Sequence, residues 1–242
     1  MLRKIEGNIL RIELSNPPLN LLTLNDVKEL EDILLRNKNQ VILIISGEGN
    51  NFSYGLDYKE FSGLSSEDIE SRLRYIKRVF NLLRLFNGFV ISAVEGIALD
   101  EGFELMLMSD YIIAKPTVRL GYSKDRVRYP ISLGGFRRII SKAGETLLYK
   151  ILFEGGTISG EYAYSNRLIE FIDDDPLGYA YKLADYFIMI YGEEGIRNIK
   201  SLLKEKYVHY DSILLSIEDT LLERTVLQYE LSSLFTNLRH IL

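Results

Sequence analysis

Short apolar runs alternate with amphipathic helical stripes along most of the chain. Runs rich in β-branched residues predict buried strands, which fall at 2–6, 8–14, 41–46, 89–94, 111–114, 117–120 and 168–172. Apolar residues at helical spacing predict helices between these strands, at 23–36, 65–86, 136–142 and 145–153 and from near residue 101. Buried strands that alternate with helices imply a mostly parallel sheet with crossover helices, which is an α/β fold.

Residues 176–242 follow a different pattern, because helical spacing continues there with no further predicted strand. Helices are predicted at 179–191, 194–206 and 212–238. The last helix carries too much apolar surface to face water alone, so we expect it to pack on the main domain or on a neighbouring subunit. We therefore divide the chain into an α/β core at 1–175 and a helical oligomerisation region at 176–242.

The stretch from 89 to 114 has the greatest potential for chemistry. A predicted strand is followed by a turn at Gly96, a second short extended piece at 97–99, and a helix that starts near Glu101. A helix N-terminus at the end of a buried strand suits developing negative charge, because its first amides lack acceptors within the helix and the dipole is positive there. Glu104 lies one turn further on, near the same amides.

Composition and charge argue against several classes of protein. The 29 basic and 34 acidic residues give a net charge of -5, which disfavours general nucleic-acid binding. The absence of cysteine excludes disulfides, thiolate nucleophiles and cysteine-ligated metals, and two histidines far down the chain disfavour a histidine-rich metal site. The start lacks the apolar stretch of a signal peptide, and no run reaches the length of a membrane span. We therefore expect a soluble, cytoplasmic protein with no nucleic-acid or membrane partner.

Four segments, in matching order and spacing, carry a resemblance to a known family. They are NPPLN at 16–20, VILIISGEG at 41–49 with FSYGLD at 52–57, ISAVEGIAL at 91–99 with Glu104 and Asp110, and ISGEYA at 158–163. In these segments the chain resembles the crotonase superfamily, which includes the enoyl-CoA hydratases and isomerases. The resemblance implies a crotonase-like ββα spiral with a C-terminal helical region, assembled as a homotrimer or a dimer of trimers. It implies an acyl-CoA thioester substrate and no metal or redox cofactor, with coenzyme A present only as part of the substrate.

The same resemblance implies roles for individual residues. The backbone amides of Leu56 and Glu101 are expected to form an oxyanion hole for the thioester, where removing one donor typically costs about 3 kcal/mol of barrier. Glu104 corresponds to the family's first catalytic glutamate, a general acid and base near the α and β carbons of the substrate. Further residues are expected to bind the substrate, and these are Asn20, Leu21, Leu22, Gly55, Asp57, Gly102 and Lys124.

Two departures from the family pattern bear on the reaction. A run that is usually three glycines is Asp100-Glu101-Gly102 here, so the side chain of Glu101 can crowd the thioester or repel an enolate. Lys124 occupies the position of the family's second catalytic glutamate. Hydration uses two carboxylates, whereas a 1,3-proton shift needs one base that returns the proton, so isomerisation is less affected.

These departures leave alternatives open. Lys124 also fits an ordinary loop lysine, and Glu104 also fits a structural residue that pairs with a lysine or faces solvent. The leading hypothesis is an acyl-CoA enzyme of the enoyl-CoA hydratase/isomerase type. The alternative is a catalytically degenerate CoA-ester-binding or structural paralogue. A serine peptidase lacks support, because the chain has no G-x-S-x-G motif and no histidine near a candidate serine.

Overall fold

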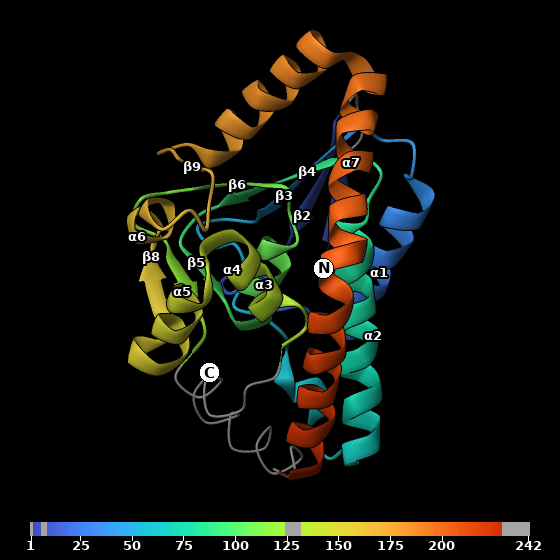
Figure 1. The fold of residues 1–242 in the computed structure, drawn as a ribbon, viewed down its shortest axis with the longest axis vertical. Helices are drawn as coiled ribbons and strands as arrows, with labels where there is room; N and C mark the ends of the chain where they lie inside the picture. The colour runs from blue at the N-terminus through green and yellow to red at the C-terminus, as the bar shows by residue number, and fades with distance from the viewer. Residues whose placement is uncertain (1, 6–8, 124–131, 229–242) are drawn as a thin grey trace.

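A six-stranded sheet forms the centre of the molecule, which is a computed structural model that describes residues 2–5, 9–123 and 132–228. Its strands lie in the order β1-β2-β3-β4-β6-β9 (Figure 1). Only the β1–β2 pair is antiparallel among the described strands of this sheet, which confirms the predicted mostly parallel arrangement. The bounds are Leu2–Ile5 for β1, Leu10–Leu14 for β2, Ile42–Gly47 for β3, Phe89–Val94 for β4, Tyr111–Ala114 for β6 and Phe171–Ile172 for β9.

Alternate residues of the central strands face two separate layers of helices. On one face, Leu43 and Ile45 of β3 join a core that also contains the apolar sides of α1 (Leu24–Arg36), α2 (Ser66–Arg84) and α3 (Asp100–Leu107). On the other face, Ile42 and Ile44 pack with Ala180 at the start of α7 (Pro176–Gln228). Strands covered on both sides read as continuous apolar runs, which is why 41–46 shows no alternation. Each fully buried aliphatic side chain contributes about 1.5–3 kcal/mol.

A second, three-stranded sheet positions the start of α3. It consists of β5 (Ile97–Leu99), β7 (Arg119–Gly121) and β8 (Thr157–Ser159), in the order β5-β7-β8. Because α3 begins at the residue after β5, the register of β5 against β7 fixes where the first turn of the helix lies. The remaining elements are η1 (Tyr58–Phe61), α4 (Gly135–Ala143), α5 (Glu145–Tyr149), the π-helix Lys150–Gly155 and α6 (Gly160–Ser165).

The C-terminal helices differ from the prediction. The break expected between 191 and 194 is present as a kink at Gly192, where φ is 63°, but the next expected break is missing from α7, which runs from Pro176 to Gln228. The predicted break at 207–211 is wrong, because those residues include neither glycine nor proline and nothing in them forces the helix to end. After the kink α7 lies beside α2, and before it the helix crosses the sheet (Figure 1). The proposed division at residue 175 stays a prediction.

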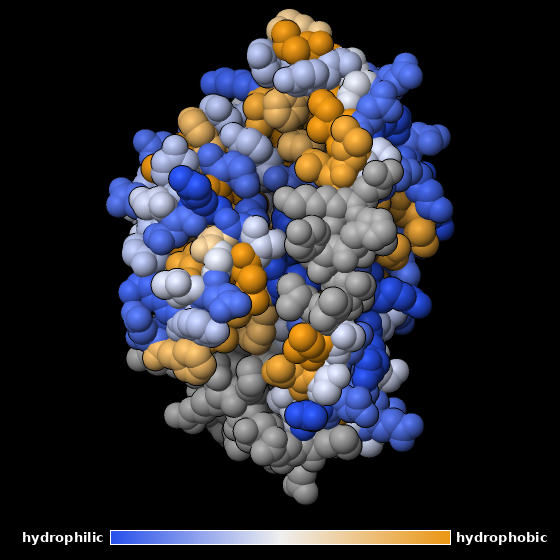
Figure 2. All heavy atoms as spheres, in the orientation of Figure 1, coloured by the Kyte–Doolittle hydropathy of each residue, from blue (hydrophilic) through white to orange (hydrophobic). Residues whose placement is uncertain are grey.

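Several large apolar side chains of α7 are exposed. Met189 and Leu202 are 72% and 70% exposed, and Ile190, Tyr191 and Ile199 are also on the surface. Figure 2 shows apolar side chains gathered at the end of the molecule where α7 turns. Within the described part of the chain, every helix is too short or too polar to span a lipid bilayer.

Candidate active site

Two turns from distant parts of the sequence meet beside β5. The loop after β3 lies against this strand, because the amide of Ser53 donates to the carbonyl of Ile97 at 3.1 Å and the amide of Leu99 donates to the carbonyl of Ser53 at 3.0 Å. Further along the same loop, Leu56 forms an isolated parallel bridge with Leu22. The turn that carries Leu56 is therefore held next to the start of α3.

Glycines allow the two turns to approach closely. Gly55 has a φ of +114°, a conformation that residues with a side chain rarely adopt. A Cβ atom on Gly102 would lie 2.3 Å from the carbonyl oxygen of Ser53, so the third position of Asp100-Glu101-Gly102 requires glycine. Asp100 has a φ of 51°, and its carboxylate accepts a hydrogen bond from the amide of Ser123 at 2.7 Å.

The amides of Leu56 and Glu101 are brought to the same place. A Cβ atom added to Gly55 would lie 3.2 Å from the backbone nitrogen of Glu101. Leu56 is the residue after Gly55, so its amide is also near this place. The Glu101 amide belongs to the first turn of α3, whose amides have no acceptor within the helix. The geometry thus juxtaposes the two donors that sequence reasoning singled out.

The side chain of Glu101 lies against one of these donors, the amide of Leu56. Its Oε2 accepts a hydrogen bond from the amide of Leu56 at 3.1 Å, and it would lie 2.8 Å from a Cβ atom added to Gly55. The hydroxyl of Tyr58 donates to Oε1 at 2.8 Å and to Oε2 at 2.9 Å. Glu101 is only 1% exposed. An anionic oxygen therefore already occupies the Leu56 donor.

Glu104 is fully buried one turn along the same helix. Its Oε2 accepts from the amides of Leu133 at 2.6 Å and Gly135 at 3.1 Å, and its Oε1 accepts from the hydroxyl of Tyr122 at 3.0 Å. Gly135 is the first residue of α4, so the positive end of that helix dipole also faces the carboxylate. These donors offset the cost of burying a charge. The solvent-facing alternative for Glu104 is wrong, because the side chain is fully buried.

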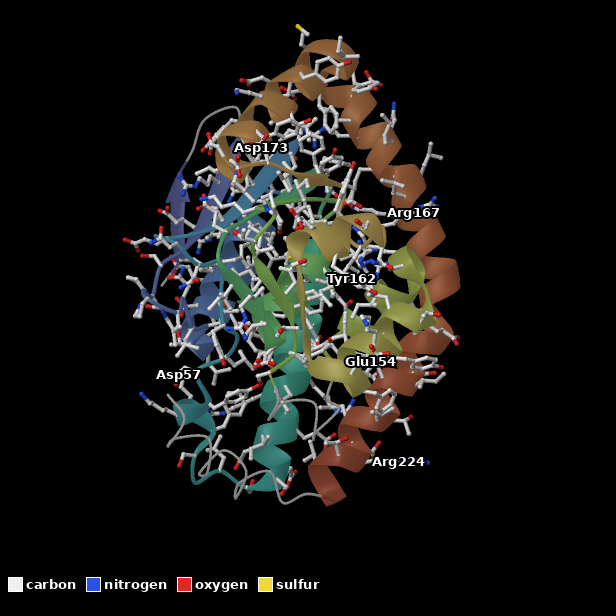
Figure 3. The ribbon with its side chains drawn as sticks, turned by 90° about the vertical axis from the view of Figure 1, so that its left-hand side faces the viewer. Asp57, Glu154, Tyr162, Arg167, Asp173 and Arg224 are labelled. Atoms are coloured by element: carbon white, nitrogen blue, oxygen red, sulfur yellow. The ribbon has the colours of Figure 1, made fainter. Side chains whose placement is uncertain are left out.

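The residues expected to bind the substrate lie mainly in the loops around the Leu56 turn. Asn20 is buried, and its side-chain amide donates to the carbonyls of Glu48 at 2.9 Å and Asn51 at 2.7 Å, so this side chain braces two loops. Leu22 is joined to the Leu56 turn by backbone hydrogen bonds, and Leu21 precedes it half-buried. Asp57 accepts a hydrogen bond from the amide of Lys59 at 3.1 Å and so caps η1 (Figure 3). Lys124 lies outside the described residues.

Sequence reasoning missed the two tyrosines that contact the glutamates. Tyr58 donates to Glu101 across 43 positions, and Tyr122 donates to Glu104 across 18 positions. The chain contains 16 tyrosines, and no local pattern separates these two from the others. The ring of Tyr122 is fixed by edge-on contacts with Phe103 and Phe136, at centroid distances of 5.5 and 5.6 Å.

Comparisons with known proteins show the family to which the chain belongs. The family model described as enoyl-CoA hydratase/isomerase matches residues 4–225. The chain is 29% identical over 168 residues to a 2,3-dehydroadipyl-CoA hydratase from Escherichia coli, covering 68% of this chain and 64% of that protein. It is 27% identical over 202 residues to a probable enoyl-CoA hydratase from Bacillus subtilis, covering 81% of this chain and 77% of that one.

The fold has close counterparts among solved structures. An enoyl-CoA hydratase/isomerase from Mycobacterium paratuberculosis superposes with a TM-score of 0.86 at 20% identity, covering 98% of this chain and 97% of that one. The likeness confirms the expected crotonase-type α/β architecture. Since the family model spans nearly the whole chain, the protein belongs to the enoyl-CoA hydratase/isomerase family.

Proposed function

We propose that the protein is an acyl-CoA enzyme in which the amides of Leu56 and Glu101 polarise a thioester carbonyl and Glu104 moves a proton. One observation carries the proposal: a carboxylate oxygen lies 3.1 Å from the Leu56 amide, beside the first-turn amide of α3. A position where a backbone amide holds a carboxylate oxygen beside a second amide is suited to the oxygen of an enolate. Donors fixed where charge develops are often the largest single contribution to catalysis.

The arrangement of Glu104 favours proton transfer by a single base. Removal of a proton beside the thioester carbonyl leaves an enolate, and return of that proton two carbons away gives the isomerised product. A single carboxylate can perform both transfers, because it keeps the proton that it removes and then returns it. Glu104 is such a carboxylate, held in place by the hydroxyl of Tyr122 and by two amides. Hydration requires a second group that positions water. We therefore favour isomerisation of an enoyl-CoA over its hydration.

Substitution of Glu104 tests this proposal. Glu104→Gln keeps the shape of the side chain but removes the base, so turnover of 3-enoyl-CoA esters should fall by about a hundredfold or more. Glu161→Gln, an exposed position in α6, is the matched control and should keep the wild-type rate. Rates are measured by following formation of the 2-enoyl product, with circular dichroism to establish folding. Equal rates for Glu104→Gln and the wild type would exclude the proposed role.

A second candidate is supported by the position of Glu101. Its carboxylate accepts a hydrogen bond from the Leu56 amide, which is the donor that a thioester oxygen needs. This contact favours a CoA-ester-binding protein without catalysis. This candidate predicts that acyl-CoA esters bind but that no enoyl-CoA of any chain length is turned over. A panel of 2-enoyl and 3-enoyl esters with short, medium and long acyl chains separates the two candidates.

We also propose that the protein assembles as a homotrimer or a dimer of trimers. The support is the exposed apolar surface of α7, where Met189 and Leu202 are largely exposed to solvent. A second subunit would cover such side chains. Sedimentation at micromolar concentration tests the proposal, and a monomer there would contradict it.

A further inference from the structure

The carboxylate of Glu101 and a thioester oxygen compete for one position. Oε2 of Glu101 lies 3.1 Å from the Leu56 nitrogen, at ordinary hydrogen-bond length. A second oxygen at that length from the same nitrogen would overlap Oε2 or lie far from the line of the N–H bond. An enolate oxygen would meet a further cost, because it would carry negative charge beside a carboxylate.

Tyr58 holds the carboxylate in this position. Its hydroxyl lies within 2.9 Å of both oxygens of Glu101, so rotation of the side chain away from Leu56 must break this contact as well. Tyr58 belongs to η1, which starts two residues after Leu56, so the same short segment supplies both donors. Gly55 leaves the space that Oε2 fills, because a Cβ there would lie 2.8 Å from that oxygen.

Glu104 is not placed to act in the same way. Its oxygens are engaged by Leu133, Gly135 and Tyr122, on the side of α3 that faces α4. The two glutamates of α3 therefore have separate environments. The carboxylate of Glu101 accepts a hydrogen bond from a donor that the substrate needs. The carboxylate of Glu104 is held by donors from elements other than the Leu56 turn.

We infer that the Glu101 side chain is an internal occupant of the oxyanion site, latched by Tyr58, and that an acyl thioester binds only by displacing it. The inference rests on the proposed function, because it assigns a regulatory state to the same site. The closed state holds the carboxylate on the Leu56 amide. The open state frees that amide for the thioester oxygen, and its population sets the apparent affinity for the ester.

Free coenzyme A provides the internal reference for a test. It shares the nucleotide and pantetheine portions of an acyl-CoA but has no thioester carbonyl, so its binding does not compete with Glu101. The experiment measures dissociation constants for acetoacetyl-CoA and for free coenzyme A by isothermal titration calorimetry. The proteins compared are the wild type, Glu101→Ala, Glu101→Gln and Tyr58→Phe.

The expected results are graded. Glu101→Ala should tighten acetoacetyl-CoA binding by at least about tenfold, since the displaced contact is a charge-assisted hydrogen bond. Glu101→Gln should give a smaller gain, because its amide oxygen can still accept from Leu56. Tyr58→Phe should also tighten binding, because it removes the latch alone. Free coenzyme A should bind all four proteins alike, to within about twofold. Glu161→Ala and Tyr164→Phe, both exposed in α6, are matched controls and should bind like the wild type.

The outcomes separate failure of this inference from failure of the proposed function. If the ester binds the wild type and the Glu101 variants equally, or binds the variants more weakly, Glu101 does not occlude the site and the proposed function still stands. If neither ester nor free coenzyme A binds any of the proteins, the proposed function fails and the inference with it. Should Glu101→Ala not fold, Glu101→Gln and Tyr58→Phe decide the question, because each removes only a charge or a single hydroxyl.

Discussion

Two buried acidic groups at the two ends of α3 show how differently a charge can be accommodated. At the start of the helix, Glu101 accepts hydrogen bonds from a backbone amide and from a tyrosine hydroxyl. Just beyond its end, Asp110 accepts from the ammonium of Lys200 at 2.5 Å and from the amide of Val90 at 2.8 Å. The side chains of Asp110 and Lys200 are 2% and 0% exposed.

The difference lies in what can replace each contact. The donors on Glu101 serve any oxygen of suitable position, so under the proposed function a substrate carbonyl takes the place of the carboxylate. The contact between Asp110 and Lys200 is a pair of opposite charges, and removal of either partner leaves the other uncompensated in the interior. Buried acids can therefore be compared by asking whether a ligand atom can substitute for them. By that comparison Glu101 belongs to a site and Asp110 to the framework.

Breaking the Asp110–Lys200 pair should produce the largest effect on stability. Lys200→Met removes the ammonium and leaves the Asp110 carboxylate buried, so the free energy of unfolding should fall by about 3–5 kcal/mol. Burial lowers the pKa of Lys200 and Asp110 raises it, with burial dominant, which reflects how strongly this site penalises a charge without its partner. Urea denaturation provides the measurement.

Lys182→Met, at an exposed position of the same helix, is the matched control and should change stability little. The double variant Asp110→Asn with Lys200→Met should recover part of the loss, because no unpaired charge remains. A loss for Lys200→Met no greater than that of the control would show that the pair is not part of the framework.

Removal of the Tyr122 hydroxyl should have an intermediate effect. Tyr122→Phe takes one donor from the buried carboxylate of Glu104, so the free energy of unfolding should fall by about 1–3 kcal/mol. Turnover should fall with it, because Glu104 loses a group that orients it. Tyr58→Phe supplies the contrast, since it removes a hydroxyl from Glu101 and should tighten ester binding. If both variants change ester affinity in the same direction, the two glutamates do not have separate roles.

The sequence predicted the scaffold better than the site. The apolar runs at 41–46 and 89–94 correspond to β3 and β4, and the helix expected from near Glu101 is α3. These elements follow from local patterns, since strands buried on both faces and amphipathic helices leave clear signatures. The helix break expected near residue 207 was wrong because 207–211 contain neither glycine nor proline, whereas the kink of α7 falls at Gly192.

The contacts of the site depend on groups that a sequence pattern does not mark. Leu133 and Gly135 reach Glu104 through backbone amides, which every residue other than proline possesses. Tyr58 reaches Glu101 only because the loop after β3 lies against β5. The resemblance to the family implied roles for the amides of Leu56 and Glu101, and these roles stay predictions. The rotamer that places the Glu101 carboxylate on the Leu56 amide is a matter of three-dimensional packing.

A third buried acid, Asp26, sharpens the comparison and should give the smallest effect. Its Oδ2 accepts from the amide and the hydroxyl of Thr23, at 2.9 and 2.6 Å, in the capping box that begins α1. Like Glu101 it accepts from an amide and a hydroxyl, and the side-chain amide of Asn16 also donates to Oδ2 at 2.9 Å, yet these contacts hold the start of a helix. Donor type alone therefore does not define a site, because the donors must also lie where a ligand oxygen is needed.

The contribution of Asp26 to stability should depend on pH, because only its charged form accepts these hydrogen bonds fully. Burial would raise the pKa of Asp26, but hydrogen bonds and a nearby positive charge, with the hydrogen bonds from Thr23 among them, favour its charged form, and the pKa lies below its ordinary value. A carboxyl whose pKa is lowered by folding stabilises the protein at pH values above its pKa in the unfolded chain, which is about 4. That stabilisation is lost as the pH falls through the pKa of the folded state. At pH 7, Asp26→Asn should lower the free energy of unfolding by about 1 kcal/mol, the usual worth of a helix cap. Urea titrations between neutral pH and pH 3 should show the gap to the wild type narrowing as the wild-type carboxylate becomes protonated. Ester affinity should stay unchanged throughout, and a change in it would mean that the cap of α1 is coupled to the oxyanion site.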